Sequence, residues 1–437
     1  MFSRRTAVRV VAALGGLALV GATLVGCSSS GNSSSGPTTI TLMAGGNDPA
    51  ATKFANDLAS AFHQANPTIT VKVDTRPPGT DGDNLVKTRL STGTMDDVFL
   101  YNTGSLFQAL HPDQTLQPLT DQPWVKDLSS DFKKTVSTAK GLYGAPNGST
   151  FDGGIMYNKK VYARLGLSVP TTWAQFISNS QKIKAAGIIP VLASYGDSWT
   201  SQLFVLADFA NVSAQVPDWA TKYTADQEKY VNPPALAGFT HTEQIFDLGL
   251  MNKDYASLTN VNALKELATG QAAQYPMITV VIPNVEQSNP SQVNDIGYFA
   301  MPPDSGAPHA TVWEAGGAYI PKSTTGAKLA AAEKLVAFIN SPTGCDLQNT
   351  ASLPSGPYAI STCKVPGNAP ALVADEAKYQ TAGTTGLALE FISPIKGPNL
   401  EKILVQVGSG ITKAAAGAAL YDNDVKAQAQ QLGLPGW

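Results

Sequence analysis

Apolar and polar positions in the first third of the chain repeat with two different periods. Short apolar runs that end in Gly, Asn, Asp or Pro are typical of buried strands, whereas apolar residues at every third or fourth position indicate helices. Strands and helices that alternate in this way predict an α/β fold with a largely parallel sheet and helices on both faces. The predicted elements are a strand at 39–44, a helix at 54–62, a strand at 69–73, a helix at 85–90 and a strand at 97–101.

Polar residues directly follow two of these predicted strands. Asn47 and Asp48 come after the first strand, and Tyr101 and Asn102 come at the end of the third. Because ligands bind beyond the carboxyl ends of the strands in parallel sheets, these four residues are candidate ligand contacts. Two alternatives stay open: the Asn-Asp-Pro sequence also suits a simple turn, and Tyr101 also suits the core of the sheet.

The first 26 residues have a different pattern, that of an export signal. Three arginines precede an uncharged apolar run at 10–25, which is shorter than the roughly 20 residues that span a bilayer. The run ends in Leu-Val-Gly-Cys27, which resembles a bacterial lipobox, and a Ser/Gly-rich stretch follows. We expect residues 1–26 to be a lipoprotein signal peptide, Cys27 to carry lipid such as palmitate, and residues 27–37 to form a flexible tether. The alternative is a plain secreted protein in which Cys27 occurs by chance. The export route of the chain, general or twin-arginine, stays open.

Length and charge narrow the functional classes. The 437-residue chain has a net charge of −3, and because residues 1–26 contain three Arg and no acid, the remainder carries −6. About 400 residues exceed the usual limit of about 250–300 for one hydrophobic core, so two lobes are expected. The sequence has no basic block of the kind that binds nucleic acid, and charged residues form only 14% of it. A surface rich in uncharged polar groups favours a neutral ligand.

Two cysteines, Cys345 and Cys363, remain once Cys27 is assigned to lipid. An even pair outside the cytoplasm predicts a disulfide, and the Pro- and Gly-containing segment between the two can turn back on itself. Closing that loop would stabilise the fold by roughly 3 kcal/mol. Two free, buried thiols are the alternative.

Signatures of catalysis are missing from the sequence. No His-x-x-x-His or Cys-x-x-Cys spacing indicates a zinc site, and there is neither a Gly-x-Ser-x-Gly nucleophile elbow nor a phosphate-binding P-loop. Carboxylate pairs occur, but each also suits a helix cap or a solvated helix face. We therefore expect no catalytic residue, no metal and no cofactor. The pairs are Asp96 with Asp97, Glu243 with Asp247, and Asp422 with Asp424.

Several later segments, taken in order, carry a more specific signal. They are Gly-Leu-Tyr-Gly-Ala-Pro at 141–146, Tyr-Asn-Lys at 157–159, Leu-Gly-Leu at 165–167 with Pro-Thr-Thr-Trp at 170–173, Ala-Thr-Gly-Gln-Ala-Ala at 268–273, Gly-Gly-Ala-Tyr-Ile-Pro-Lys-Ser at 316–323 and a helix at 331–340. Together with the lipobox, they resemble the extracellular solute-binding proteins of ABC importers, the large family that includes maltose-binding protein.

The resemblance implies two α/β lobes joined by a hinge, with the ligand held in a cleft between them. One lobe would comprise residues 38–146 plus 297–341, and the other 147–296 plus 342–437. The chain would be a monomer, anchored by lipid outside the cytoplasm, that captures a sugar or oligosaccharide without turnover and presents it to ABC permease subunits. A non-sugar solute in the same fold (peptide, polyamine or anion) and a surface glycosidase are the alternatives.

Sugar binding requires aromatic rings against the apolar faces of the sugar and polar groups that satisfy its hydroxyls. Trp199 with Asp197, after a predicted strand, and Trp313 with Glu314 provide such combinations. In similar family members, loops at both positions face the cleft, although core packing is the alternative for either Trp. Asp152 lies near the predicted crossover between the lobes, where relatives place a hydroxyl-binding acid, and an Asp-Gly-Gly turn is its alternative.

The chain departs from maltose-binding protein in two places. The segment 277–283 lacks the tryptophan that stacks on sugar in that protein, and 399–407 lacks the aromatic residue found there. We therefore expect the ligand to be held differently, and we do not expect it to be maltose.

Overall fold

The structure is a computed structural model, and part of the N-terminal region lies outside its description. The predicted signal peptide at 1–26, the lipidation site Cys27, most of the tether at 27–37 and the candidate contacts Asn47 and Asp48 lie outside the described residues. Within the described part, every helix is too short or too polar to cross a membrane. The described residues are 36–46, 49–77 and 79–437.

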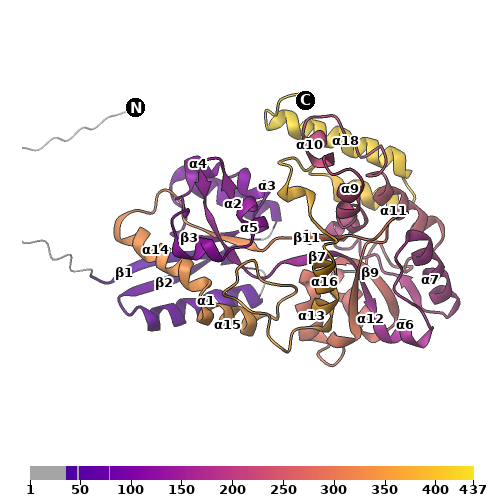
Figure 1. The fold of residues 1–437 in the computed structure, drawn as a ribbon, viewed down its shortest axis with the longest axis horizontal. Helices are drawn as coiled ribbons and strands as arrows, with labels where there is room; N and C mark the ends of the chain where they lie inside the picture. Colours follow the sequence, from indigo (N-terminus) through magenta and orange to yellow (C-terminus); the bar gives the residue numbers. More distant parts are fainter. Residues whose placement is uncertain (1–35, 47–48, 78) are drawn as a thin grey trace, which may run out of the picture. The chain divides into compact units, whose positions relative to one another are not determined.

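The first of two main sheets has five strands, with β1 paired in parallel to β2 and β3 (Figure 1). Leu42 and Met43 of β1 point to opposite faces of the sheet, and both are fully buried, so both faces are covered. Strand β12 joins from much later in the chain and runs antiparallel to β3 and β6. In spatial order the strands are β2 (Ile69–Arg76), β1 (Thr38–Gly45), β3 (Val98–Tyr101), β12 (Gly316–Tyr319) and β6 (Gly144–Asn147).

Helices pack on this first sheet as the sequence pattern predicts. The apolar stripe at 54–62 lies in α1 and the one at 85–90 lies in α2, while the three predicted strands coincide with β1, β2 and β3. Helix α15 packs beside α1, and α14 packs against β1. The helices are α1 (Pro49–Ala65), α2 (Gly79–Thr92), α5 (Ser130–Thr135), α14 (Gly326–Ile339) and α15 (Pro342–Ala351).

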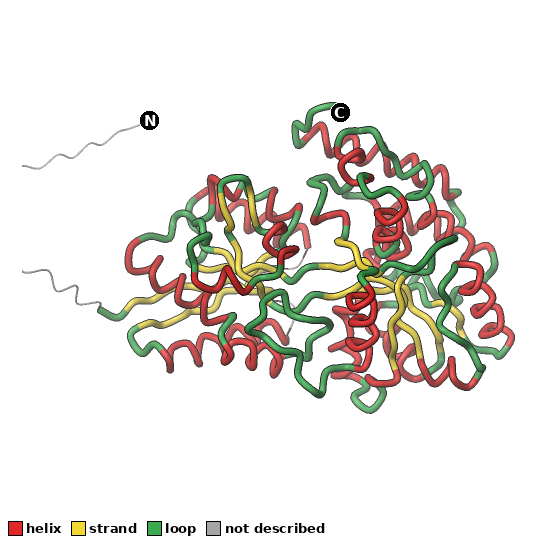
Figure 2. Tube along the Cα trace, viewed as in Figure 1, coloured by secondary structure: helices red, strands yellow, loops and turns green. Residues whose placement is uncertain are grey.

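The second sheet has six strands arranged around β7, which pairs antiparallel with β9, β10 and β11. Helices α7, α12 and α16 pack against this sheet, and a helical cluster that includes α11, α17 and α18 lies beside it (Figure 2). The strands are β7 (Phe151–Asn158), β8 (Ile189–Val191), β9 (Ala272–Ile278), β10 (Ile296–Ala300), β11 (Ala310–Trp313) and β13 (Thr385–Leu387). The helices are α7 (Trp173–Ala185), α11 (Ala237–Asp247), α12 (Asn260–Thr269), α13 (Ile282–Ser288), α16 (Ala371–Ala382), α17 (Leu400–Gly408) and α18 (Ala414–Gln431).

The chain passes between the two sheets three times. It crosses at 148–150 between β6 and β7, at 314–315 between β11 and β12, and at 352–370 between α15 and α16. The predicted fold class, an α/β protein with two sheet-containing lobes, is thus confirmed. Strands β10 and β11, which lie at 296–313, pair with β7 in the second sheet.

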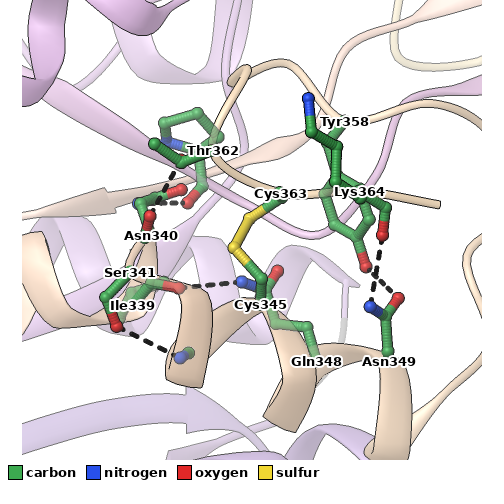
Figure 3. The surroundings of a disulfide bond; sticks show 12 residues. Ile339, Asn340, Ser341, Cys345, Gln348, Asn349, Tyr358, Thr362, Cys363 and Lys364 are labelled. Carbon is green, nitrogen blue, oxygen red and sulfur yellow. Dashed lines mark hydrogen bonds between the residues drawn. A yellow bond between two sulfur atoms is a disulfide. The ribbon is translucent and has the colours of Figure 1, made fainter. Parts of the chain in front are cut away.

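The predicted disulfide between Cys345 and Cys363 is confirmed, with a Cα–Cα distance of 5.2 Å (Figure 3). Both cysteines are buried in the hydrophobic core of the first sheet. Cys345 lies in α15. After α15 the chain passes the cavity and then returns to the core of the first sheet, where Cys363 is buried. The bond therefore closes a loop that leaves the first sheet and comes back to it.

Candidate functional site

A cavity of about 660 Å³ lies where the crossings meet the ends of the strands, and residues from both sheets and their helices line it. The segments 147–151, 280–284 and 348–358 contribute most of the lining residues. The lining residues are Ala51, Phe54, Asn147, Gly148, Ser149, Phe151, Trp199, Asn260, Val280, Val281, Pro283, Asn284, Gly316, Gln348, Ala351, Ser352, Leu353, Pro354, Ser355 and Tyr358.

The chemistry of this lining is apolar and polar but uncharged. Among the described residues that line the cavity there is no Asp, Glu, Lys, Arg or His. Amide and hydroxyl groups come from the Asn, Gln and Ser side chains, and aromatic surface comes from Phe54, Phe151, Trp199 and Tyr358. Burial raises the pKa of Tyr358 to about 12, so its hydroxyl is neutral at physiological pH. Such a wall suits a neutral ligand with hydroxyl groups and apolar faces.

Trp199, a predicted contact, lines this cavity from a short 3-10 helix (Ser198–Gln202), and the loop before this helix is held by hydrogen bonds. Its loop follows β8, and Ser194 at the start of the loop donates to the Thr200 hydroxyl at 3.0 Å and bonds the Tyr275 hydroxyl. The Asp197 carboxylate accepts from the backbone N–H of Asn260 at 2.6 Å, at the start of α12. Asp197 thus fixes the loop to a helix N-terminus, where a negative charge is favourable, and leaves the half-buried Trp199 ring at the cavity.

Trp313, the other predicted tryptophan, stands behind the wall of the cavity. It is 7% exposed and stacks on Phe151, with ring centroids 6.1 Å apart and planes at 9°. Phe151 in turn lines the cavity. Phe151 was missed in the sequence because a single Phe at the start of a strand carries no signal of its own. Its place directly after a crossover, beside the predicted Asp152, is the feature that could have indicated it.

Two predicted acids, Asp152 and Glu314, are buried and are not among the residues that line the cavity. Glu314 is 6% exposed, its Oε2 has no hydrogen-bond partner among the described residues, and burial raises its pKa to about 7. Neither carboxyl oxygen of Asp152 has a partner within that same part of the chain. Burial raises the pKa of Asp152 and of the neighbouring Glu376, and repulsion from Asp152 adds to the rise at Glu376. A role of these acids in ligand binding stays a prediction.

Tyr101 and Asn102 end β3 as predicted, away from the lining of this cavity. The buried Tyr101 hydroxyl donates to Asp83 Oδ1 at 2.9 Å, and the Arg76 guanidinium lies 5.2 Å from the centre of its ring. The Asn102 side chain is exposed, and its backbone carbonyl accepts from the Tyr319 hydroxyl at 3.0 Å. Their part in ligand binding also stays a prediction. Within the described residues, no group of three or more His, Cys, Asp or Glu is placed to hold a metal ion.

The family follows from comparison with known proteins. A sequence model of the bacterial extracellular solute-binding proteins matches residues 45–344, well over half of the chain. The chain belongs to this family. Its members act outside the cytoplasm, so the predicted extracytoplasmic compartment is confirmed at that level.

Relatives with similar sequences are named for the sugars that they bind. The multiple sugar-binding protein of Streptococcus mutans is 24% identical over 314 residues, which are 71% of this chain and 72% of that protein. The melibiose/raffinose/stachyose-binding protein of Bacillus subtilis is 27% identical over 152 residues, which are 34% of each chain.

Solved structures share the fold over nearly the whole chain. A chitin oligosaccharide binding protein superposes with a TM-score of 0.77 at 14% identity and covers 90% of this chain and 100% of its own. The RafE solute-binding protein in complex with raffinose gives a TM-score of 0.72 at 19% identity, over 90% of this chain and 99% of its own. At such identities the likeness shows the fold alone, and it confirms the predicted two-lobe architecture.

Proposed function

We propose that this chain captures a neutral sugar or oligosaccharide for an ABC importer and binds it in the cavity between the sheets. The observation that carries the proposal is the cavity wall, which joins aromatic rings to amide and hydroxyl groups and, within the described residues, includes no charged side chain. The names of the sequence relatives, which bind multiple sugars, melibiose, raffinose or stachyose, support the same class.

The uncharged wall also separates this proposal from the other solutes. An anion, a polyamine or a peptide with charged termini would lose hydration in the cavity without meeting an opposite charge among the described residues that line it, which is costly. A sugar instead offers C–H faces to Trp199, Phe151 and Tyr358, and hydroxyls to side chains such as Asn147 and Gln348. A hydroxyl that finds its partner avoids the penalty of an unpaired buried polar group.

Binding would close the two lobes about the three crossings. We propose that one lobe comprises residues 38–147 and 316–351, and the other 151–313 and 371–437, because these ranges follow the strand pairing. A ligand that touches both lobes shifts the population toward the closed form by binding it more tightly. A micromolar Kd needs a net gain of only about 8 kcal/mol. The chain would act without turnover, as a monomer, and the closed form would engage the permease.

A ligand screen by thermal shift tests the sugar proposal. The chain from residue 37 onward is tested with melibiose, raffinose, stachyose and chitin oligosaccharides, and in parallel with spermidine, sulfate and short peptides. A ligand at about 100 times its Kd adds about 2.7 kcal/mol to stability, which is a readable rise in Tm. A rise with sugars alone supports the proposal. A rise with spermidine, sulfate or peptides alone would overturn the sugar assignment, and release of monosaccharide from an oligosaccharide would indicate a glycosidase.

We further propose that lipid on Cys27 anchors the protein to the outer face of the cell membrane. The support is the Leu-Val-Gly-Cys motif at the end of an export signal and the Ser/Gly tether that follows. Replacing the cysteine, Cys27→Ser, removes the thiol that is acylated, so we expect the protein to move from the membrane fraction to the medium. Fractionation with an antibody measures the distribution. A Cys27→Ser protein that stays with membranes would contradict the anchor without affecting the sugar proposal.

A further inference from the structure

A disulfide closes the loop that contains the first part of the third crossing. The loop closed by Cys345 and Cys363 supplies seven of the twenty lining residues. Those seven are Gln348, Ala351, Ser352, Leu353, Pro354, Ser355 and Tyr358. A change in the position of this loop would therefore change about a third of the wall.

Hydrogen bonds fasten this loop to the first crossing, at 148–150. The Gln348 side chain accepts from the backbone N–H of Gly148 at 2.8 Å, and Pro357 accepts from the N–H of Thr150, also at 2.8 Å. The backbone N–H of Ser355 donates to Ser149 Oγ at 3.2 Å. The first and third crossings thus form one surface facing the ligand cavity.

The disulfide lies beside the residues that begin and end this part of the wall (Figure 3). Cys345 and Gln348 lie three residues apart in α15, and so on one face of the helix. At the other end of the loop, the Tyr358 hydroxyl donates to Asn349 Oδ1 at 2.8 Å, and Asn349 Nδ2 donates to the carbonyl of Lys364, next to Cys363, at 3.3 Å. The N-terminal end of the wall segment lies in α15. The disulfide and these two hydrogen bonds connect its C-terminal end to the same helix.

We propose that the Cys345–Cys363 disulfide positions the ligand wall: it holds residues 348–358 against the first crossing, so that the oxidised protein has a preformed site. The inference rests on the proposed function, because it assigns that wall to the ligand. Reduction leaves the two thiols in a core that can still form, but it releases the loop ends, so the wall must be ordered when ligand binds. Ordering a loop on binding lowers affinity. Reduction would leave the other cavity residues in place.

Amide hydrogen exchange tests the positioning without any ligand. The mature chain carries Cys27→Ser, so that Cys345 and Cys363 are its only thiols, and it is compared oxidised, reduced with dithiothreitol, and as Cys345→Ser/Cys363→Ser. Dithiothreitol supplies two electrons and two protons and closes to its own disulfide. We expect at least ten-fold faster exchange at Gly148, Thr150 and Ser355 after reduction, reversed by reoxidation, and unchanged exchange in β10. Equal exchange at those three amides in all forms would overturn the proposal.

Raffinose is the probe for the effect on binding, measured by calorimetry well below the Tm of each form. We expect reduction, or the double Ser variant, to raise the Kd at least ten-fold, and reoxidation to restore it. Asp422→Asn is the matched control: it weakens an acceptor of the Tyr230 and Val231 N–H groups, far from the wall, so Tm should fall while Kd stays unchanged.

The two readouts separate this proposal from the proposed function. Raffinose that binds the oxidised and reduced forms equally well would overturn the role of the disulfide and leave the sugar proposal standing. Raffinose that binds neither form would count against the sugar proposal, and the amide exchange would then decide the positioning alone.

Discussion

At the residue scale, Trp199 is held mainly through its backbone and its neighbours. Ser194 and Asp197 anchor its loop to β9 and α12, and Gln202 donates to the Trp199 carbonyl at 3.1 Å. The ring itself stays half-buried at the cavity. A ring in a fixed loop loses little conformational freedom when ligand binds, so more of its contact energy appears as affinity.

We predict that Trp199→Ala weakens binding of the sugar found in the screen by about 1–3 kcal/mol, or roughly 5- to 150-fold in Kd. The hydrogen bonds of the segment remain, but the ring also packs against the core of the second sheet, so the Tm of the free protein should fall as well. Titration calorimetry measures the Kd. The control is Trp437→Ala, because Trp437 donates to the Thr224 carbonyl and is not among the cavity residues, so its loss should leave the Kd unaltered. An unchanged Kd in Trp199→Ala would remove this ring from the site.

The two predicted tryptophans also show what a local motif can and cannot reveal. Each stands beside a carboxylate after or before a strand, and the sequence pattern treats them alike. Trp199 lies in a short 3-10 helix that follows a strand, and its half-buried ring lines the cavity. Trp313 is the last residue of β11, and the pairing of β11 with β7 places its ring on Phe151. Which face of a strand is covered depends on partners distant in sequence, so the motif alone could not distinguish the two.

At the element scale, each crossing between the sheets is accompanied by a buried carboxyl group. Asp152 follows the first crossing, Glu314 belongs to the second, and Glu376 lies in α16 after the third. All three are at most 6% exposed. Burial in this apolar setting favours the neutral form, so the pKa of each is raised. The connections between the lobes should therefore respond to pH.

We predict that Glu314→Gln changes the pH dependence of stability between about pH 4.5 and 7. The folded protein holds the Glu314 proton up to a pKa of about 7, whereas the ordinary value is 4.5. The folded state thus binds more protons in this window, so the contribution of Glu314 to the free energy of unfolding falls as pH rises and is lost above about pH 7. At about 1.36 kcal/mol per pKa unit, a rise from 4.5 to about 7 gives a full effect of at most about 3.4 kcal/mol. Gln at this position should remove that slope.

Urea unfolding from pH 4.5 to 8 measures the effect as the difference between wild type and variant. Glu243→Gln is the control: the hydrogen bond from Lys413 lowers the pKa of Glu243 below its ordinary value of 4.5, so its difference curve should be nearly flat across this window. The stability that Glu243 contributes is present at higher pH and is lost as pH falls through its folded pKa. A difference curve for Glu314→Gln that is flat across the window would show that this carboxyl titrates normally.

We predict that Gly356→Ala disturbs the contact between the third crossing and the first. A Cβ at Gly356 would lie 2.4 Å from the carbonyl oxygen of Thr150, so one backbone segment must shift. Overpacking of this kind costs about 1–3 kcal/mol, which chemical unfolding detects, and the shifted wall should also raise the sugar Kd. Gly367→Ala in the same crossing is the matched control, since its Cβ would meet nothing within 4 Å. Equal stability of the two variants would contradict the tight fit.

Elements built from neighbouring residues could be predicted from the sequence, and elements built from distant ones could not. Local periodicity predicts the strands at 39–44, 69–73 and 97–101. They correspond to β1, β2 and β3, and β1 pairs with both of the others. The strands β10 and β11 pair with β7, about 140–160 residues earlier in the chain. Antiparallel partners at that separation leave no mark in either strand alone, so their sheet could not be assigned.

At the scale of the whole molecule, the charged residues of the chain lie outside the described wall of the cavity. The sequence carries 30 Lys and Arg and 33 Asp and Glu, yet none of them is among the described residues that line the cavity. The ion pairs given by the structure, such as Arg89 with Asp96 and Lys413 with Glu243, belong to the two lobes instead. If the ligand binds against this described wall, we expect electrostatic attraction to contribute little to its affinity.

Salt therefore distinguishes a neutral ligand from a charged one for the molecule as a whole. Raising NaCl from about 50 mM to 500 mM shortens the Debye length from roughly 14 Å to 4 Å, which screens attraction between a charged ligand and the protein. We predict that the Kd for the sugar found in the screen changes by less than about two-fold over this range, measured by calorimetry at constant pH. Spermidine, tested as a cationic comparison against the net negative chain, should lose any weak binding as salt rises. A sugar Kd that weakens ten-fold would mean that charged groups beyond the described wall contact the ligand, and the uncharged site would then be incomplete.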